Sequence, residues 1–312
     1  MAWLFPTLED LAALSRDLKR MPPVEVDEEL RGWSYGQGAV APGGGPQVGV
    51  ADVAGGFCES SRDAYLRYVA RIPQRDNRVL QRGRLLHEAW TRTVSAVKKA
   101  LYAAQELPSA AQLSTELRSF EAGYKESAVQ RYRLLSPDAV RWLVEKVVAE
   151  AAYTYSASLE RQLARSRFLE LDGLASSVIP LVTEFPVDGG RVGLSRSLRL
   201  DALLLFSIPL ELKTRTPRPE FEIALAGYAI ALESEYEAPV DRGLLLYVEV
   251  DEERKRLFVR PKLVAIGNSL RSAFIEKRDR VKEILAYRED PGLPSRCSPE
   301  CPYLHYCRGG EK

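Results

Sequence analysis

Several features that mark specialised classes of protein are missing from this sequence. Its 312 residues contain no run of 18 apolar residues and no basic segment followed by an apolar stretch at the start, so we expect no membrane partner and a cytoplasmic location. The net charge is only +1, so a nucleic-acid site would have to be a local basic groove on a balanced surface. Asparagine occurs only at Asn77 and Asn268, a scarcity that is typical of thermophilic proteins.

Hydrophobic residues make up 46% of the chain, which suffices for a sizeable core, and their periodicity separates helices from strands. The predicted helices cover residues 8–20, 78–104, 110–167 with a break at Ser136–Pro137, 221–235 and 261–287. Strand patterns occupy residues 177–213, with a hairpin turn at Asp188, Gly189 and Gly190, and then residues 243–250 and 257–260. This order predicts an α/β fold with a mixed central sheet flanked by helices.

The same pattern divides the chain into segments. Residues 1–50 form an N-terminal helical and loop segment, and residues 51–312 form the main domain. Within that domain, residues 109–168 read as a helical insertion and residues 291–312 as a cysteine-rich tail. We therefore expect the chemistry of the protein to lie between residue 51 and the tail.

The stretch LRLDALLLFSIPLELKT, which begins at Leu198, predicts two strands joined by a tight turn at residues 207–209. Side chains alternate along a strand, so Glu211 and Lys213 project from one face and Leu212 from the other. Asp201 on the neighbouring strand would bring a second carboxylate to them. Two carboxylates and an ammonium group suit a divalent cation and a hydrolytic water, as in nucleases, although the same residues also fit a solvated strand.

His87 is one of only two histidines and lies on the predicted helix 78–104. A lone histidine on a helix is compatible with a packed or surface residue. However, Gly83 lies four residues before it, and a glycine allows another backbone or a substrate to approach closely. The nearby arginines, which suit phosphate groups, are Arg78, Arg82, Arg84 and Arg92.

The four cysteines predict a metal site. Cys297, Cys301 and Cys307 lie close together in the tail with C-x3-C-x5-C spacing, and Cys58 is the remaining partner. Disulfides are not expected in a cytosolic protein. The spacing leaves zinc and an iron–sulfur cluster as alternatives, and either one would clamp the two ends of the domain together.

With these residues assembled, the chain resembles the RecB-like nucleases of the restriction-endonuclease-like, or PD-(D/E)xK, fold. More closely it resembles the Cas four exonucleases of CRISPR systems, in particular their archaeal Csa-one branch. The matching pieces lie between about residues 50 and 310 and follow the family order: Cys58 with the helix CESSRDAYL, Gly83-x-x-x-His87, Glu184 on a strand, Asp201 in LRLDAL, Glu211-Leu212-Lys213, Tyr228 on a helix, and the cysteine-rich tail.

The resemblance implies a role for each matching residue. His87, Asp201 and Glu211 would bind Mg²⁺ or Mn²⁺, with the carbonyl of Leu212 as an additional ligand. Lys213 would orient or help to deprotonate the attacking water and stabilise the charge that builds on the phosphate. Further expected site residues are Glu184, which would lie beside the ligands or reach the metal through water, and Tyr228, Arg82 and Arg84, which would contact the substrate.

The resemblance also implies an iron–sulfur cluster on Cys58, Cys297, Cys301 and Cys307. A 4Fe–4S cluster is favoured, while 2Fe–2S stays open because the first tail spacing is three residues where the common form has two. The implied function is a metal-dependent exonuclease that acts on single-stranded or frayed DNA before its capture as a CRISPR spacer, together with integrase proteins. In one departure, Ala224 replaces the glutamine of the family's Q-x-x-x-Y motif, which leaves a DNA-binding or adaptor subunit with a vestigial site as the alternative.

Overall fold

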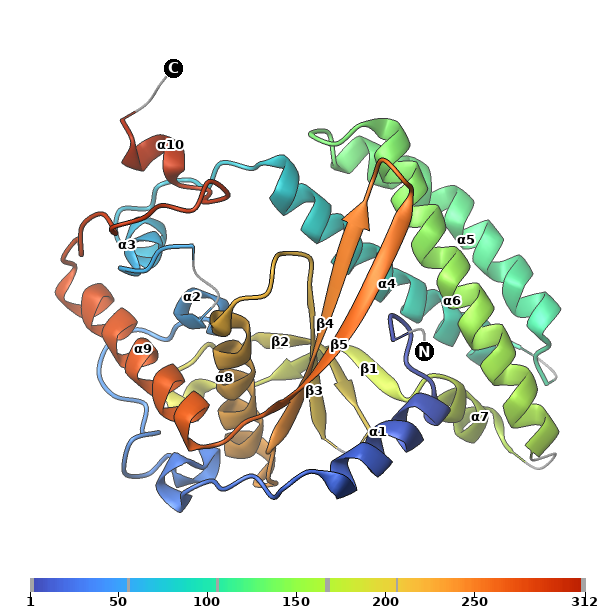
Figure 1. Cartoon of the computed structure of the whole chain (residues 1–312), viewed down its shortest axis with the longest axis horizontal. Coiled ribbons are helices and arrows are strands. Elements are labelled where there is room, and N and C mark those ends of the chain that lie inside the picture. Colours follow the sequence, from blue (N-terminus) through green and yellow to red (C-terminus); the bar gives the residue numbers. More distant parts are fainter. Residues whose placement is uncertain (1–2, 55–56, 105–106, 166–168, 206, 310–312) are drawn as a thin grey trace.

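The centre of the molecule is a mixed β-sheet (Figure 1). The computed structural model describes residues 3–54, 57–104, 107–165, 169–205 and 207–309. Within these residues the sheet has five strands in the order β1-β2-β3-β4-β5. The strands are β1 (Leu181–Val187), β2 (Leu198–Leu204), β3 (Ile208–Lys213), β4 (Arg242–Asp251) and β5 (Arg256–Ala265).

The strand directions follow from the connections between them. β1, β2 and β3 are successive antiparallel neighbours, and β4 and β5 form an antiparallel hairpin. β3 and β4 are parallel, since a helix crosses over between them. That helix is α8 (Pro219–Tyr236). The predicted mixed α/β arrangement and the β1–β2 hairpin are therefore confirmed.

The helices surround this sheet. In chain order, the remaining described helices are α1 (Leu8–Arg20), α2 (Val50–Ala54), α3 (Arg62–Tyr68), α4 (Arg78–Tyr102), α5 (Ala110–Arg131), α6 (Pro137–Arg165), α7 (Leu171–Val178), α9 (Asn268–Tyr287) and α10 (Leu304–Cys307), with single 3-10 turns at Glu28–Leu30, Gly32–Ser34 and Gly190–Val192. No helix in the described part of the chain is both long enough and apolar enough to cross a membrane.

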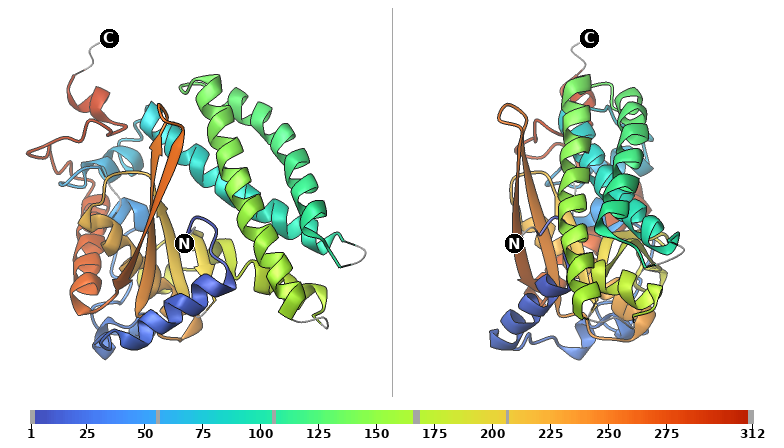
Figure 2. Two further views of the ribbon diagram at one scale, coloured as in Figure 1. Left: turned by 45° about the vertical axis from the view of Figure 1, so that its right-hand side comes forward. Right: turned by 90° about the vertical axis from the view of Figure 1, so that its right-hand side faces the viewer.

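Two hydrophobic cores separate the helices into layers. One core joins the sheet residues Leu210, Leu212 and Leu246 to α4, α5 and α6. The other core joins Leu245 and Tyr247 to α2, α8 and α9. Alternate residues of the buried strands thus face opposite helical layers, as the two-residue period of a strand requires. Figures 1 and 2 show α8 and α9 on one side of the sheet and α4 with the α5–α6 pair on the other.

The helical segment between α4 and β1 forms an antiparallel pair. Helices α5 and α6 pack along each other and against α4, as Figure 2 shows. The break between them falls at the predicted Ser136–Pro137, because proline is favoured in the first turn of a helix. This pair lies beside α4 and leaves the first half of α4 close to the sheet.

The first 50 residues pack into both cores. Phe5 and Leu11 belong to the core on the α4 side, whereas Val40 and Val48 belong to the core on the α8 side. Helix α1 begins with a capping box, in which the side chain of Thr7 accepts from the backbone amide of Asp10 and the side chain of Asp10 accepts from the backbone amide of Thr7. The domain boundary at residue 50 stays a sequence-based prediction.

Two boundaries predicted at prolines were wrong. Pro209 was placed in the turn, but it lies within β3 opposite Leu203. Residues 261–265 were assigned to a helix, but they continue β5 along β4 and Pro261 lies opposite Leu246. For Pro261 the reason is the position of β5 at one edge of the sheet, where a missing amide need remove no ladder hydrogen bond. Pro209 lies in a central strand, but the pairing of β3 with β4 begins only at Leu210.

Candidate active site

Asp201 lies where three elements meet. One oxygen of its carboxylate, on β2, accepts a hydrogen bond from the backbone amide of Leu212 on β3 at 2.7 Å. The other oxygen lies 3.1 Å from Nδ1 of His87 on α4. The side chains of His87 and Asp201 remain 35% and 22% exposed, so they are accessible to a substrate. Residues 114 positions apart in the sequence are thus brought together.

Glu211 and Lys213 extend this group along β3. They project from the same face of the strand, as predicted, and Lys213 Nζ donates to Glu211 Oε2 at 2.7 Å. The other oxygen of Glu211 lies 3.3 Å from the backbone amide of Asp201. Leu212 points the opposite way and is fully buried in the core with α4 and α6. The burial of Leu212 holds the register of β3 and so fixes the direction of both charged side chains.

Burial and the two carboxylates determine the charges of this group. Burial raises the pKa of Glu211, and the nearby charge of Asp201 raises it further. For Asp201 burial works in the same direction, but His87 outweighs it and the pKa of Asp201 falls below its ordinary value. Burial acts to lower the pKa values of Lys213 and His87, yet the neighbouring carboxylates raise both. Lys213 is therefore positively charged at neutral pH.

The donor atoms fit the chemistry of a divalent cation. Nδ1 of His87 and Oδ1 of Asp201 are 3.1 Å apart, close to the roughly 3.0 Å between adjacent ligands of an octahedral ion with 2.0–2.1 Å bonds. Glu211 adds a second carboxylate, which is buried and whose pKa is raised by that burial and by the charge of Asp201. Across the described residues, no group of three or more His, Cys, Asp or Glu side chains is gathered tightly enough to hold a metal ion as it stands. Ligation by these residues stays a prediction.

Helix α8 covers the face from which Glu211 and Lys213 project. The ring of Phe221 lies 5.4 Å from Lys213 Nζ. Burial raises the pKa of Tyr228 well above its ordinary value, and the charges of Glu211 and Asp201 add to this effect, so the Tyr228 hydroxyl lies near the carboxylates. Ala224, one turn before Tyr228, is 5% exposed and belongs to the core.

Glu184 lies at the margin of the group. In the β1–β2 register Thr183 pairs with Ala202 and Phe185 pairs with Leu200. Glu184 is therefore placed opposite Asp201 on the adjacent strand. Its φ of 49° turns it out of the ladder, its side chain is 57% exposed, and its carboxylate lies 4.0 Å from Arg199. The structure thus places Glu184 beside Asp201 in the sheet but directs its charge to a surface arginine.

The predicted substrate arginines lie in the first half of α4. Arg82 forms an ion pair with Glu252 at 3.4 Å, and Arg84 pairs with Asp76. Between them, the missing side chain of Gly83 leaves room for Thr214, whose Oγ1 lies 3.0 Å from the position that a Cβ would take. The expected close approach at Gly83 is therefore made by the residue after Lys213, and it holds α4 against the end of β3.

The four cysteines meet near α3 and α10. All of them are free and half-buried. Burial, the Asp63 carboxylate and two neighbouring thiols raise the pKa of Cys301 to about 11. Those thiols belong to Cys58 and Cys307. Burial also raises the pKa of Cys307, with contributions from Cys58 and Cys297. These mutual effects indicate that the thiols are neighbours, although within the described residues they are not gathered tightly enough to hold a metal ion as they stand.

Side chains of α3 and α4 attach the tail. Arg62 donates to both oxygens of Asp290 at 2.8 and 2.7 Å and to the sulfur of Cys307 at 3.4 Å. Asn77 caps α4 by accepting from the amide of Leu80, and its side-chain amide donates to the carbonyl of Glu300 at 3.1 Å. The tail therefore contacts the start of the helix that carries His87.

Sequence reasoning missed Arg215. Its guanidinium carbon lies 4.5 Å from the ring centroid of Phe57 and 5.2 Å from that of Phe221, so it stacks between residues that are far apart in the sequence. The available signal was its position two residues after Lys213 in KTRTPRP. Arginine side chains commonly donate to phosphate oxygens, which makes Arg215 a candidate for such a contact.

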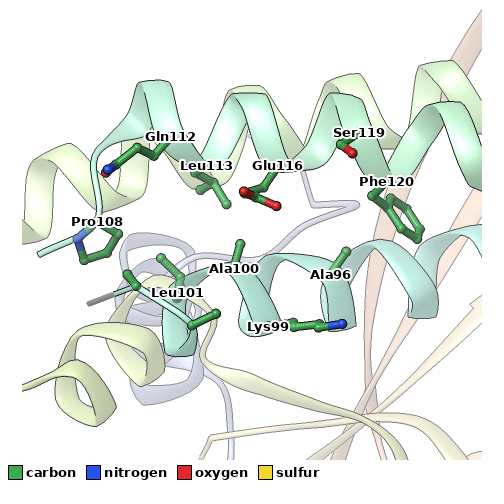
Figure 3. Close-up of a pocket in the computed structure, with 12 residues that line it drawn as sticks. Ala96, Lys99, Ala100, Leu101, Pro108, Gln112, Leu113, Glu116, Ser119 and Phe120 are labelled. Carbon is green, nitrogen blue, oxygen red and sulfur yellow. The ribbon is translucent and has the colours of Figure 1, made fainter. Parts of the chain in front are cut away.

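A separate cavity of about 470 Å³ lies between α4 and α5 (Figure 3). Ala96 and Ala100 of α4 face Leu113 and Glu116 of α5 across it, as the close-up shows. Its described lining includes none of the predicted site residues. The chemistry is therefore assigned to the Asp201 group and not to this cavity.

Comparison with known proteins gives the family. A family model described as CRISPR-associated exonuclease Csa1 matches residues 4–310. A CRISPR-associated exonuclease Csa1 of Saccharolobus solfataricus is 34% identical over 308 residues, which cover 97% of this chain and 99% of that protein. Another, of Thermoproteus tenax, is 30% identical over 304 residues, which cover 97% of this chain and 99% of that protein. The chain therefore belongs to the CRISPR-associated exonuclease Csa1 family.

Proposed function

We propose that this protein is a metal-dependent exonuclease that hydrolyses phosphodiester bonds in single-stranded or frayed DNA. The observation that carries the proposal is the convergence of His87, Asp201, Glu211 and Lys213 from three elements on one half-buried group. The names of the two relatives, CRISPR-associated exonuclease, support the reaction class. The mixed sheet with helices on both faces is compatible with a restriction-endonuclease-like, PD-(D/E)xK fold.

His87, Asp201 and Glu211 would hold Mg²⁺ or Mn²⁺, with the Leu212 carbonyl as a further candidate ligand. When bound, the cation supplies Lewis acidity toward the phosphoryl group. Lys213 contributes a fixed positive charge, because Glu211 and Asp201 keep it protonated against the effect of burial. It stabilises negative charge on the phosphate and orients a water through its remaining donors.

The cysteine region supports a second proposal. Cys58, Cys297, Cys301 and Cys307 would hold an iron–sulfur cluster, for which 4Fe–4S is favoured and 2Fe–2S remains the alternative. Thiolate is the ligand of such clusters, and four free cysteines from two ends of the chain supply it. The cluster would join the tail to α3 and to the start of α4.

In the cell, we propose that the enzyme trims DNA before its capture as a CRISPR spacer and acts with the integrase proteins of that system. The relatives' names give the CRISPR association. The side chains of Asp201 and Glu211 are only 22% and 6% exposed, and a flexible single-stranded end can reach such a site.

The decisive experiment compares wild type and Lys213→Ala on end-labelled single-stranded DNA with Mn²⁺ or Mg²⁺. We expect stepwise shortening by the wild type and a loss of about 10²-fold or more in the variant, because the variant lacks the positive charge that stabilises the developing phosphate anion. Lys262→Ala is the matched control. Lys262 also pairs with a glutamate, Glu222, at 2.5 Å, but its side chain is 51% exposed on β5.

Two outcomes would overturn the assignment. The first is intact DNA after incubation of the wild type with either cation. The second is equal cleavage by wild type and Lys213→Ala, which would move the chemistry away from β3. A chelator added to the wild type should stop cleavage, and cleavage that survives the chelator would contradict the metal dependence.

A non-catalytic DNA-binding or adaptor subunit is the second candidate. One observation favours it: Ala224 stands in the core of α8 where the related nucleases have glutamine. Ala224→Gln would supply the missing amide one turn before Tyr228. An inactive wild type that becomes active with Ala224→Gln would establish a vestigial site, whereas an active wild type removes this candidate.

A further inference from the structure

A cavity of about 360 Å³ begins directly beyond the candidate catalytic lysine. Its walls are the loop 214–217 that follows β3, the residues 247–250 of β4, Arg82 of α4 and Arg260 of β5. In the sheet register Lys213 pairs with Tyr247, and Tyr247 pairs with Arg260. The cavity and the Asp201 group are thus neighbours on the same strands.

The charged residues that line this cavity are mainly basic. The cavity is lined by three arginines, Arg82, Arg215 and Arg260. Glu249 is the acid among its described lining residues. Arg82 lies 3.4 Å from the carboxylate of Glu252, and Arg260 lies 3.8 Å from that of Glu249. The side chain of Arg260 is 66% exposed. Exposed ion pairs of this kind contribute little to stability, so a phosphate can replace the carboxylates at small cost.

Arg215 is the fixed member of the set. Its guanidinium lies between the rings of Phe57 and Phe221, and its side chain is only 18% exposed. One guanidinium nitrogen, Nη1, is buried and has no hydrogen-bond partner among the described residues. That nitrogen lies 3.9 Å from Glu300, beyond hydrogen-bond range, while Arg218 lies 4.0 Å from the same carboxylate. Two guanidinium groups thus share one acid, and positive charge remains.

The chemistry of this lining selects phosphate. A planar guanidinium presents paired donors that match the oxygens of a phosphodiester, and stacking on aromatic rings fixes its plane before the ligand arrives. A site next to the hydrolytic group receives the same strand that is being cut. A neighbouring backbone phosphate is therefore the ligand that both the position and the donors fit.

We propose that the cavity lined by Arg82, Arg215 and Arg260 binds a backbone phosphate of the DNA strand that is being cut, next to the phosphate that is hydrolysed. The position of this phosphate next to the hydrolysed one rests on the proposed nuclease function. Phosphate binding does not depend on catalysis. Measuring DNA binding without cleavage therefore tests the phosphate site separately from the nuclease function.

The first test measures binding of the full chain to fluorescent single-stranded DNA by anisotropy, without added divalent cation and at several salt concentrations. We expect Arg215→Gln and Arg260→Gln each to weaken DNA binding about tenfold, because each variant loses one charge-assisted hydrogen bond to a phosphate. The dependence of log Kd on log salt should also fall by about 0.7, the value for one phosphate of a single strand. Arg141→Gln, which removes an exposed arginine that pairs with Glu126 on the α5–α6 pair, is the control and should leave both quantities unchanged.

Arg260→Gln protects the test against misfolding. Arg215 packs between two rings, so its replacement could disturb the local structure. Arg260 is 66% exposed, and its loss should not affect folding. A salt dependence unchanged in Arg260→Gln and in a folded Arg215→Gln would overturn the proposal, even if the wild type cleaves DNA.

The second test changes the DNA. Single methylphosphonate linkages, which lack the phosphate charge, are placed one at a time along the oligonucleotide. Wild type should lose about tenfold in affinity at one linkage, and Arg215→Gln should show no further loss there, because the two changes remove the same contact. Equal losses in both proteins at every linkage would overturn the proposal. Arginine-dependent binding without cleavage in Mn²⁺ would instead retain the phosphate site and reject the nuclease function.

Discussion

The Asp201 group and the cysteine-rich tail are held by different parts of the fold. Asp201, Glu211 and Lys213 lie on adjacent strands, and backbone amides of those strands lie within 2.7 and 3.3 Å of the two carboxylates. The tail cysteines lie on loops and on the short helix α10, where side chains such as Arg62 attach them. Strand register therefore orients the two carboxylates and Lys213, while α4 adds His87; we expect the thiol region to depend on a bound metal or cluster.

This difference predicts opposite responses to mutation. In the strand-held group, an isosteric change should remove chemistry and leave the fold intact. In the loop-held group, a ligand change should loosen the fold and leave the chemistry of the folded molecule intact.

Asp201→Asn gives the largest expected effect. Asparagine keeps an oxygen for the Leu212 amide but loses the charge that faces His87. DNA cleavage should fall at least 10²-fold, while the melting temperature changes by only a few degrees, because the repulsion between Asp201 and Glu211 is also removed.

The control for that change is Asp188→Asn. Asp188 accepts from the Gly190 amide at 2.8 Å in the β1–β2 turn, and asparagine makes the same contact. Cleavage should equal that of the wild type. Large unfolding by Asp201→Asn would show that strand register does not by itself hold the site.

Cys301→Ser should act mainly on stability. Serine removes one thiol from the group that also contains Cys58 and Cys307, and so removes one of the four proposed ligands of the metal or cluster. We expect loss of the bound metal or cluster by absorption and elemental analysis, and a melting temperature lower by several degrees, equivalent to about 2–4 kcal/mol. Ser295→Ala, a loop change that removes a 3.2 Å contact with Glu59, is the control.

The metal analysis also separates the two ligand hypotheses. An oxygen-free preparation that is colourless and contains stoichiometric zinc would reject the iron–sulfur cluster. Unchanged metal content and melting temperature in Cys301→Ser would reject the tail as a metal-dependent clamp of either kind.

The sequence predicted those parts of the site that follow from local periodicity. Alternation along β3 placed Glu211 and Lys213 together because side chains of a strand repeat every two residues. The four cysteines could be grouped because no other cysteines compete for the role. Periodicity also gave the α5–α6 break, since proline cannot continue a helix in that position.

The parts that failed depend on contacts between distant segments. Arg215 meets Phe57 and Phe221 only in the folded chain, so no local pattern marks it. Pro261 breaks the expected pattern of a strand, but edge position makes it acceptable.

The smallest expected effect lies at Asn77, the residue that joins the two regions. Its side-chain oxygen caps α4, and its side-chain amide donates to the Glu300 carbonyl at 3.1 Å. Asn77→Asp keeps the cap, because aspartate is an equally good N-cap, but removes the donor to the tail. Asn77→Ala removes both contacts and should cost about 1 kcal/mol.

Hydrogen exchange at the amides near residue 302 measures whether the tail loosens. In Asn77→Asp these amides should exchange up to about fivefold faster, the loss of one hydrogen bond of about 1 kcal/mol. The amides of α4 should stay protected and DNA cleavage should stay within twofold of the wild type, because His87 lies on a helix whose cap is intact. A tenfold loss of cleavage in Asn77→Asp would mean that the tail positions α4 and that the two regions form one cooperative unit. The intact strand contacts of Asp201 argue for independence, since neither β2 nor β3 depends on residue 77 for its register.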